Sequence, residues 1–398
     1  GVTVIYFNPI FQARSNHKYD TGDYKRIDPM FGDEEDFKAL CREAREMGIR
    51  ILLDGVFSHT GADSRYFDRY GRYGGQGAYQ RQDSPYASWY RFRHWPEDYD
   101  CWWGFPTLPN VNEMDGSYLD FIIRDPDAVA ARWLQKGASG WRLDVADELP
   151  MAFIRMLRGR VKGEDAEAAL LGEVWEDASN KVSYGRLRSY CLGESLDSVM
   201  NYPMRDELIA FMLGRVSAPH VERRLSALQE NYPAPFFYSL MNLMGSHDRA
   251  RILNILGGLH GEDLPREARR GMALGETQLA VAKRRMVALW RFICALPGMP
   301  CLFYGDEAGL QGMADPFCRA AYPWGREDPG LWEEIRGINR ARLESPILQT
   351  GHLRLFAADG QVLCALRFAR EGKDAFGDPL EESPALFLLN RSEEEINL

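Results

Sequence analysis

The sequence predicts an α/β fold in which parallel strands alternate with helices, and three short segments carry that prediction. They are GWRLDV (Gly140–Val145), LGEVW (Leu171–Trp175) and GSHD (Gly245–Asp248). Each is read as an apolar run that leads into a carboxylate, which places three acids at the ends of buried strands. In a parallel α/β barrel, the functional groups sit at the carboxyl ends of several strands, where the loops to the next helices begin. We therefore expect a barrel with these acids facing one site.

Strand-like and helix-like segments alternate along most of the chain, as in βα units of a parallel sheet. Asp33 is suited to cap a helix that shows Phe37 and Cys41 on its apolar face and stops at Gly48. A second helix near Thr277–Leu296 has an apolar stripe at helical period, which predicts burial in the core. The predicted strands are Thr3–Pro9, Ile49–Phe57, Gly140–Val145, Ala169–Trp175, Ser198–Tyr202, Phe236–Met244 and Pro300–Gly305.

Two regions break this alternation. Thr60–Gly116 is rich in Gly, Tyr and Trp and poor in aliphatic residues, which predicts an inserted subdomain after a barrel strand. Long excursions of this kind are usually lids or binding loops. After about Leu348 the pattern changes to short alternating strands, which predicts a small antiparallel β module. Its expected strands are His352–Ala357, Val362–Phe368 and Ala385–Asn390.

Length and composition exclude several classes of function. The 398 residues fit one barrel of roughly 250 residues or more and a second module. A formal net charge of −10 argues against a nucleic-acid partner, because phosphates attract basic patches, and it is compatible with a neutral sugar. No apolar run approaches the roughly 20 residues of a membrane helix, so no membrane partner is expected. Seven singly scattered cysteines favour reduced thiols and a cytoplasmic location, with secretion as the alternative.

The chemistry of the three acids points to glycoside hydrolysis. That reaction uses one carboxylate as a nucleophile and one carboxylic acid as a proton donor. The plain alternative is three unrelated surface acids. We reject it because each acid follows a strand-like run and has Arg, Trp or His beside it.

Several motifs follow one another in an order that is specific to one family. They are KYDTGDYKRIDPMFG (Lys18–Gly32), DGVFSH (Asp54–His59), GWRLDVADE (Gly140–Glu148), LGEVWE (Leu171–Glu176), GSHD (Gly245–Asp248) and YGDEAGL (Tyr304–Leu310). From Gly1 to at least Trp324 the chain resembles the α-amylase family of glycoside hydrolases. Within that family it is most similar to the neopullulanase, cyclomaltodextrinase and maltogenic amylase branch.

The resemblance implies a role for each motif residue. Asp144 matches the nucleophile, Glu173 the acid/base that starts protonated, and Asp248 a third carboxylate that grips sugar hydroxyls. Retention of configuration would place the carboxyl groups of Asp144 and Glu173 roughly 5–5.5 Å apart. The residues expected to bind the sugar or to support those that do are Tyr19, Asp54, His59, Arg142, Trp175 and His247.

Two of these assignments rest on further reasoning. Arg142 lies two residues before Asp144, so on a strand both point to one face, and its charge should keep the nucleophile ionised. The resemblance implies that Asp54 supports Arg142 and Tyr19 from behind, and both a purely structural role and a direct catalytic role stay open for it.

The implied activity is a retaining α-glucan hydrolase. It would cleave α-1,4 bonds, and possibly α-1,6 bonds, of maltooligosaccharides, cyclodextrins or pullulan through a covalent glycosyl-enzyme. One alternative is an oligo-1,6-glucosidase or α-glucosidase, against which the segment LPNVN (Leu108–Asn112) argues mildly. Another is a catalytically inactive amylase-like binding protein, against which the full set of motif residues argues.

The chain departs from the family at positions linked to metal binding. Ser58 stands where the family usually has an Asn that helps to hold calcium, and Asp147-Glu148 stands where the branch carries Asn-Glu. No group of ligands has zinc spacing, and calcium needs six or more oxygen ligands. We expect no cofactor and no metal in this chain, and catalysis that survives EDTA.

The resemblance also sets the expected domains. It implies that the first barrel strand and helix, and an amino-terminal β domain able to mediate a homodimer, precede Gly1. The expectation is thus a (β/α)8 TIM-type barrel that lacks its first strand and helix. It divides into residues 1–59 (barrel strands 2 and 3), 60–116 (the inserted domain B), 117–347 (the rest of the barrel) and 348–398 (a partial C-terminal β domain).

Overall fold

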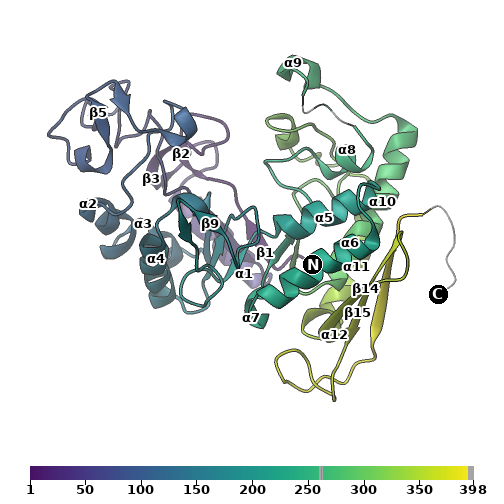
Figure 1. The fold of residues 1–398 in the computed structure, drawn as a ribbon. Helices are drawn as coiled ribbons and strands as arrows, with labels where there is room; N and C mark the ends of the chain where they lie inside the picture. Colours follow the sequence, from purple (N-terminus) through teal and green to yellow (C-terminus); the bar gives the residue numbers. More distant parts are fainter. Residues whose placement is uncertain (260, 262, 393–398) are drawn as a thin grey trace. The chain divides into compact units, whose positions relative to one another are not determined.

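A computed structural model describes residues 1–259, 261 and 263–392, which form two compact units. The first unit comprises Val2–Val174 and Ala178–Val199, and the second comprises Gly1, Trp175–Asp177 and the chain from Met200 onward. Figure 1 shows the elements of both units. The last six residues of the predicted C-terminal module, 393–398, lie outside the described part of the chain.

The first unit is built on a five-stranded parallel sheet with the order β1-β4-β7-β8-β11. Its strands are β1 (Val4–Tyr6), β4 (Arg50–Gly55), β7 (Gly140–Leu143), β8 (Ala169–Gly172) and β11 (Ser198–Val199). Neighbouring residues along the central strands are buried on both faces of the sheet. Leu53 of β4 and Trp141 of β7, for example, are 0% exposed. Burial on both faces is typical of parallel sheets, because helices cover them.

Helices of the first unit are α1 (Glu34–Glu46), α2 (Gly116–Leu119), α3 (Val129–Gln135) and α4 (Met151–Glu164). The predicted cap of α1 is confirmed, because the Asp33 carboxylate accepts bonds from the amides of Glu35 and Asp36. Gly48, beyond the end of α1, has a φ of +74°, a conformation that favours glycine.

Residues 60–116 contain little regular structure beyond the short hairpin of β5 (Phe92–His94) and β6 (Asp98–Tyr99). Aromatic rings form its core. Trp89 is 2% exposed, and its ring centroid lies 5.2 Å from that of Tyr66 and 5.3 Å from that of Phe121. Rings therefore replace the missing aliphatic side chains in this segment.

The second unit contains the parallel pair β12 (Met241–Leu243) and β13 (Met299–Cys301) and the antiparallel sheet β14 (His352–Ala357), β15 (Val362–Phe368) and β16 (Ala385–Asn390). Its longer helices are α5 (Tyr202–Met212), α6 (Ala218–Asn231), α10 (Glu276–Ala295) and α11 (Pro329–Leu343). Shorter helices are α7 (Ala234–Phe237), α8 (Ile252–Leu256), α9 (Arg266–Arg269) and α12 (Pro346–Gln349). The three predicted C-terminal strands and the long helix α10 are confirmed.

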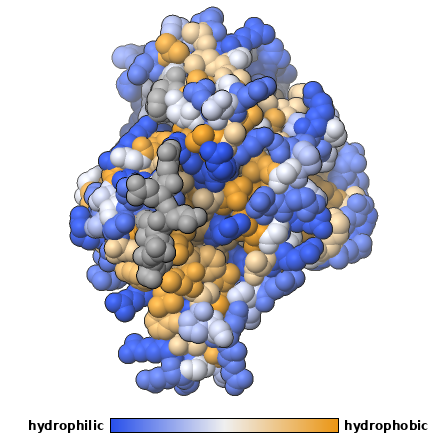
Figure 2. All heavy atoms as spheres, turned by 90° about the vertical axis from the view of Figure 1, so that its right-hand side faces the viewer, coloured by the Kyte–Doolittle hydropathy of each residue, from blue (hydrophilic) through white to orange (hydrophobic). Residues whose placement is uncertain are grey.

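Figure 2 looks onto the side on which α10 and the C-terminal strands lie in Figure 1. Hydrophobic residues gather in the middle of this face, and hydrophilic residues surround them. Leu386 and Leu388, on the outer face of β16, are 49% and 46% exposed. No described helix combines the length and the apolar character that a membrane span requires.

All seven predicted strands of the parallel sheet extend beyond the observed strands, and in three of them the excess residues belong to a helix or a turn. Phe236 lies in α7 rather than in a strand, because Pro235 fits the first turn of a helix. Tyr202 begins α5, whose N-cap Asn201 accepts a bond from the amide of Met204. β13 ends at Cys301, and Gly305 belongs to a turn with φ +84°.

Candidate active site

One buried arginine organises the site of the first unit. Arg142 is 0% exposed, and its guanidinium lies 3.0 Å from Asp54, 2.9 Å from Asp144 and 2.8 Å from Glu173. A single planar cation thus joins three carboxylates, a use for which the fixed fork of arginine is well suited. The expected contact between Asp54 and Arg142 is present.

Strand register explains why these side chains meet. Asp54 of β4 and Arg142 of β7 are direct partners in the ladder, so their side chains leave the sheet side by side. Asp144 directly follows β7, and Glu173 directly follows β8, the next strand of the sheet. Glu173 is held by the turn after β7, because its carboxylate accepts a 2.8 Å bond from the amide of Val145.

The charges of this cluster do not cancel. Burial raises the pKa of Asp144 well above its ordinary value, and Arg142 acts in the opposite direction. Burial raises the pKa of Asp54 in the same way. Asp54 and Asp144 share one guanidinium in a buried site, so the ionised form of each carboxylate disfavours the ionised form of the other.

Two tyrosines complete the cluster. Tyr19 donates a 2.9 Å bond to Asp54, as the expected contact between these residues requires, and Tyr6 donates a 2.5 Å bond to the same oxygen. The Tyr6 ring also lies 5.6 Å from the Arg142 guanidinium carbon. Tyr6 is not among the residues predicted from the sequence. The signal that would have indicated Tyr6 is a phenol at the carboxyl end of strand β1, the neighbour of β4 in the sheet.

His59 is held as a neutral ring. It is 2% exposed, and its Nε2 lies 3.1 Å from the carbonyl oxygen of Tyr19, which only accepts. The ring hydrogen is therefore on Nε2, and Nδ1 accepts a 3.0 Å bond from the Ser58 hydroxyl. Ser58 thus has a structural partner in this chain. Burial lowers the pKa of His59 to about 4.

The neutral state of His59 predicts a loss of stability in acid. An unfolded histidine titrates near pH 6.5, so the unfolded chain binds the extra proton first as the pH falls from 6.5 toward 4. Between pH 7 and 4.5 this difference should cost the wild type about 2–3 kcal/mol of unfolding free energy. We expect urea unfolding of His59→Gln to show a correspondingly smaller acid loss. The control is His94→Gln, whose side chain is 89% exposed; an identical acid loss in wild type and His59→Gln would contradict the prediction.

The remaining predicted residues lie in the second unit. Asp248 follows β12 by five residues, rather than directly, and its carboxylate lies 3.2 Å from Nε2 of His247 and 3.8 Å from the Arg319 guanidinium. Trp175 stacks on Tyr202 with ring centroids 3.9 Å apart, and the Arg249 guanidinium carbon lies 4.5 Å from the Trp175 ring centroid. Sequence-predicted site residues thus form one group in each unit.

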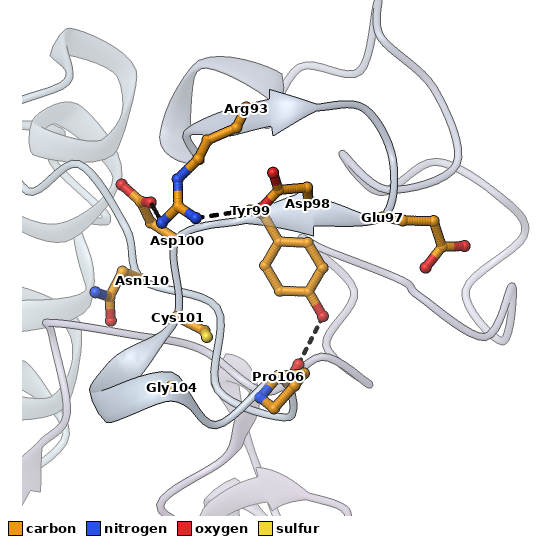
Figure 3. A pocket seen from close by; sticks show the side chains of 9 residues that line it. All are labelled: Arg93, Glu97, Asp98, Tyr99, Asp100, Cys101, Gly104, Pro106 and Asn110. Atoms are coloured by element: carbon orange, nitrogen blue, oxygen red, sulfur yellow. Dashed lines mark hydrogen bonds and ion pairs between the residues drawn. The ribbon is translucent and has the colours of Figure 1, made fainter.

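A pocket of about 570 Å³ lies in the inserted segment. Figure 3 shows Arg93 reaching across it to Asp98 and Asp100, at 3.3 and 2.6 Å, and Tyr99 donating to the carbonyl of Pro106 at 2.7 Å. The residues of the Arg142 cluster do not line it. Its polar groups largely satisfy one another, so we assign it no part in the chemistry. Among the described residues, no group of three or more His, Cys, Asp and Glu side chains is placed to hold a metal ion.

The comparison with known proteins agrees with these motifs. The family model described as "Alpha amylase, catalytic domain" matches residues 1–116 and 120–342. An amylopullulanase of Thermoanaerobacterium thermosulfurigenes is 39% identical over 99% of the chain, which covers 22% of that relative. A cyclomaltodextrinase of Geobacillus thermopakistaniensis is 31% identical over 99% of the chain and 60% of the relative.

Solved structures give the same result. The cyclic alpha-maltosyl-(1→6)-maltose hydrolase from Arthrobacter globiformis superposes with a TM-score of 0.78 at 29% identity, over 93% of this chain and 76% of that one. A structure named cyclomaltodextrinase has a TM-score of 0.78 at 31% identity, over 92% of this chain and 58% of that one. The predicted α/β barrel fold class is confirmed. The chain belongs to the α-amylase family of glycoside hydrolases.

Proposed function

We propose that this chain carries the catalytic machinery of a retaining hydrolase of α-1,4 and α-1,6 bonds in maltooligosaccharides, cyclodextrins or pullulan. The observation that carries the proposal is the Arg142 guanidinium, which lies within 3.0 Å of Asp54, Asp144 and Glu173 at once. This arrangement fixes two carboxyl groups on adjacent strands at one edge of the sheet, where a glycosidic bond can lie between them.

The reaction then proceeds in two displacements. In the first, Asp144 attacks the anomeric carbon and forms an ester, while Glu173 transfers its proton to the departing glycosidic oxygen. In the second, Glu173 takes a proton from water, whose oxygen displaces Asp144 from the anomeric carbon. The cation of Arg142 stabilises ionised Asp144 before attack and after release. Asp54 positions Arg142 and Tyr19 rather than touching the sugar.

The remaining predicted residues have proposed roles in sugar binding. In the first unit we assign Tyr19 to stacking on a sugar ring and His59 to sugar hydroxyls. In the second unit we assign His247 and Asp248 to sugar hydroxyls and Trp175 to stacking on a sugar ring. The position of Trp102 supports a substrate-facing role for the inserted residues 60–116, since its ring centroid lies 5.6 Å from that of His59.

The names of the relatives support this choice of substrates. They include amylopullulanase, cyclomaltodextrinase and a hydrolase of a cyclic sugar with a (1→6) bond. The chain spans 22%, 28% and 32% of three amylopullulanases and 60% of a cyclomaltodextrinase that it matches. The preferred glucan of the whole protein is therefore part of the proposal.

Product analysis of the full-length protein tests the proposal. Maltotriose, β-cyclodextrin, pullulan and isomaltose are supplied separately, and the first product is followed by proton NMR before it mutarotates. We expect α-anomeric products from at least one of the first three sugars and none from Asp144→Asn. Initial formation of the β-anomer would exclude retention. Cleavage of isomaltose alone would favour the oligo-1,6-glucosidase alternative, and no cleavage of any glucan would overturn the proposal.

A further inference from the structure

A loop of the first unit is fixed to the turn that follows the nucleophile. Residues 178–199 carry a hairpin of β9 (Val182–Ser183) and β10 (Arg186–Leu187), and the turn after Asp144 is a short 3-10 helix, Ala146–Glu148. Asp147 anchors the two together. Its carboxylate lies 3.1 Å from the Lys181 ammonium and accepts a 2.6 Å bond from the Tyr190 hydroxyl, and its carbonyl accepts a 3.2 Å bond from Ser183.

The next residue, Glu148, brings two exposed aromatic rings together. One carboxylate oxygen accepts a 3.2 Å bond from the indole of Trp103, and the other accepts a bond from the hydroxyl of Tyr184. Trp103 is 75% exposed and Tyr184 is 72% exposed, although both are large and partly apolar. One face of Trp103 stacks on Trp102, with centroids 5.1 Å apart and planes at 13°, which leaves its other face open.

The backbone supports a functional reading of these rings. Trp103, Val145 and Tyr184 have φ values of +47°, +39° and +51°, a conformation that side chains with a Cβ rarely adopt. Tyr184 and Gly185, with φ +71°, form the two-residue turn of the hairpin, where Asn or Gly is usual at the first position. Conformations of this kind cluster at functional sites, where the surrounding structure enforces them. Trp103 and Tyr184 thus adopt unfavourable backbone conformations while their rings remain exposed to solvent.

The position of the rings specifies which part of a substrate they meet. The rings of His59 and Trp102 are neighbours, so the row His59, Trp102, Trp103 leads outward from the reacting centre. The turn that carries Glu148 is also bonded to the proposed acid, because the amide of Ala146 donates a 3.1 Å bond to the carbonyl of Glu173. Glu173 protonates the leaving oxygen, so the sugars nearest this turn are those that depart.

We propose that Trp103 and Tyr184 form an aromatic platform that binds the sugar rings on the leaving side of the cleaved bond, with Glu148 holding both rings in place. The C–H faces of a pyranose are apolar and stack on aromatic faces, while its hydroxyls remain at the edge. This inference rests on the proposed function, since the ligand is the same α-glucan. It assigns to residues 178–199 the recognition of a leaving group that contains more than one sugar unit.

The experiment compares two substrates that differ in their leaving group. Maltotetraose releases a glucan, whereas α-maltosyl fluoride releases fluoride and has no sugar on the leaving side. In the full-length protein we expect Tyr184→Ser and Trp103→Leu each to lower the ratio of kcat/KM for maltotetraose to kcat/KM for α-maltosyl fluoride by about five- to tenfold. Tyr184→Phe, which keeps the ring and loses the bond to Glu148, should lower that ratio by a smaller factor. The control is Tyr70→Ser, which removes another exposed ring, 54% exposed, from the same unit.

The outcomes separate this platform from the proposed function. An unchanged ratio in both folded variants, or an equal loss on both substrates, would overturn the platform as a leaving-side site. If the wild type cleaves neither substrate, the proposed function fails. The platform is then tested by calorimetric titration of the wild type and the two variants with maltotetraose. A fivefold or greater loss of affinity in both variants would support it, and equal affinity, or no binding by the wild type, would reject it.

Discussion

Glu173→Gln should lower kcat/KM for maltotriose by about a thousandfold or more while the fold stays intact, because a general acid contributes about 10²–10⁴ to the rate. The amide keeps the shape of the side chain but has no acidic proton for the glycosidic oxygen. The loss should be much smaller for α-maltosyl fluoride, since fluoride departs without protonation. Steady-state kinetics on the two substrates measures the difference.

The matched control for this variant is Glu46→Gln, at the exposed end of α1, which should keep wild-type rates on both substrates. Normal turnover of maltotriose by Glu173→Gln would remove Glu173 from the acid role. An equal loss on both substrates would indicate that the residue positions Arg142 rather than donating a proton.

Arg142→Met should damage both folding and activity. Its guanidinium is the cation within 3.0 Å of Asp54, Asp144 and Glu173, and it is 0% exposed. Loss of one partner of a buried ion pair costs about 3–5 kcal/mol, because the remaining charges stay buried without compensation. Urea unfolding of the variant should show a loss of this order at pH 7. Activity should fall at least a hundredfold, since a protonated Asp144 is a poor nucleophile.

The same variant has a defined dependence on pH. Without Arg142, burial raises the folded-state pKa values of Asp54 and Asp144 further above their unfolded values. Stability linked to a raised carboxyl pKa is present at low pH and is lost as the pH rises. The stability deficit of Arg142→Met relative to wild type should therefore be larger at pH 7 than at pH 5. Arg93→Met, which removes a cation with a 62% exposed side chain, should lose far less stability than Arg142→Met. A deficit that is independent of pH would contradict this account of the cluster.

The sequence predicted the core of the site because strand geometry is local. Asp144 and Glu173 directly follow buried strands, and alternation along β7 puts Arg142 and Asp144 on one face. Whether Asp54 contacts Arg142 depends on the register between β4 and β7, which no local pattern encodes. The family resemblance supplied that contact, whereas Tyr6 had no such support and was missed.

Contacts between distant loops were harder to foresee. Asp147-Glu148 departs from the family pattern, yet nothing in the local sequence indicates its contacts. The side-chain partners of both residues lie 34 or more positions away in the chain, at Lys181, Tyr184, Tyr190 and Trp103. Two predicted strands are shorter in the structure because a helix occupies part of each. Asn201 caps the helix that begins at Tyr202, and Pro235 lies in the first turn of the helix Ala234–Phe237. Apolar character alone does not separate a short strand from a short helix.

The most direct test of the central claim is to identify the residue that carries the covalent intermediate. The full-length Glu173→Gln variant is incubated with α-maltosyl fluoride, quenched in acid, digested and analysed by peptide mass spectrometry. Our account predicts a maltosyl ester on Asp144, in the peptide that contains GWRLDV, and no adduct when Asp144→Asn is added. An adduct on any other residue would contradict the assignment of Asp144 as the nucleophile.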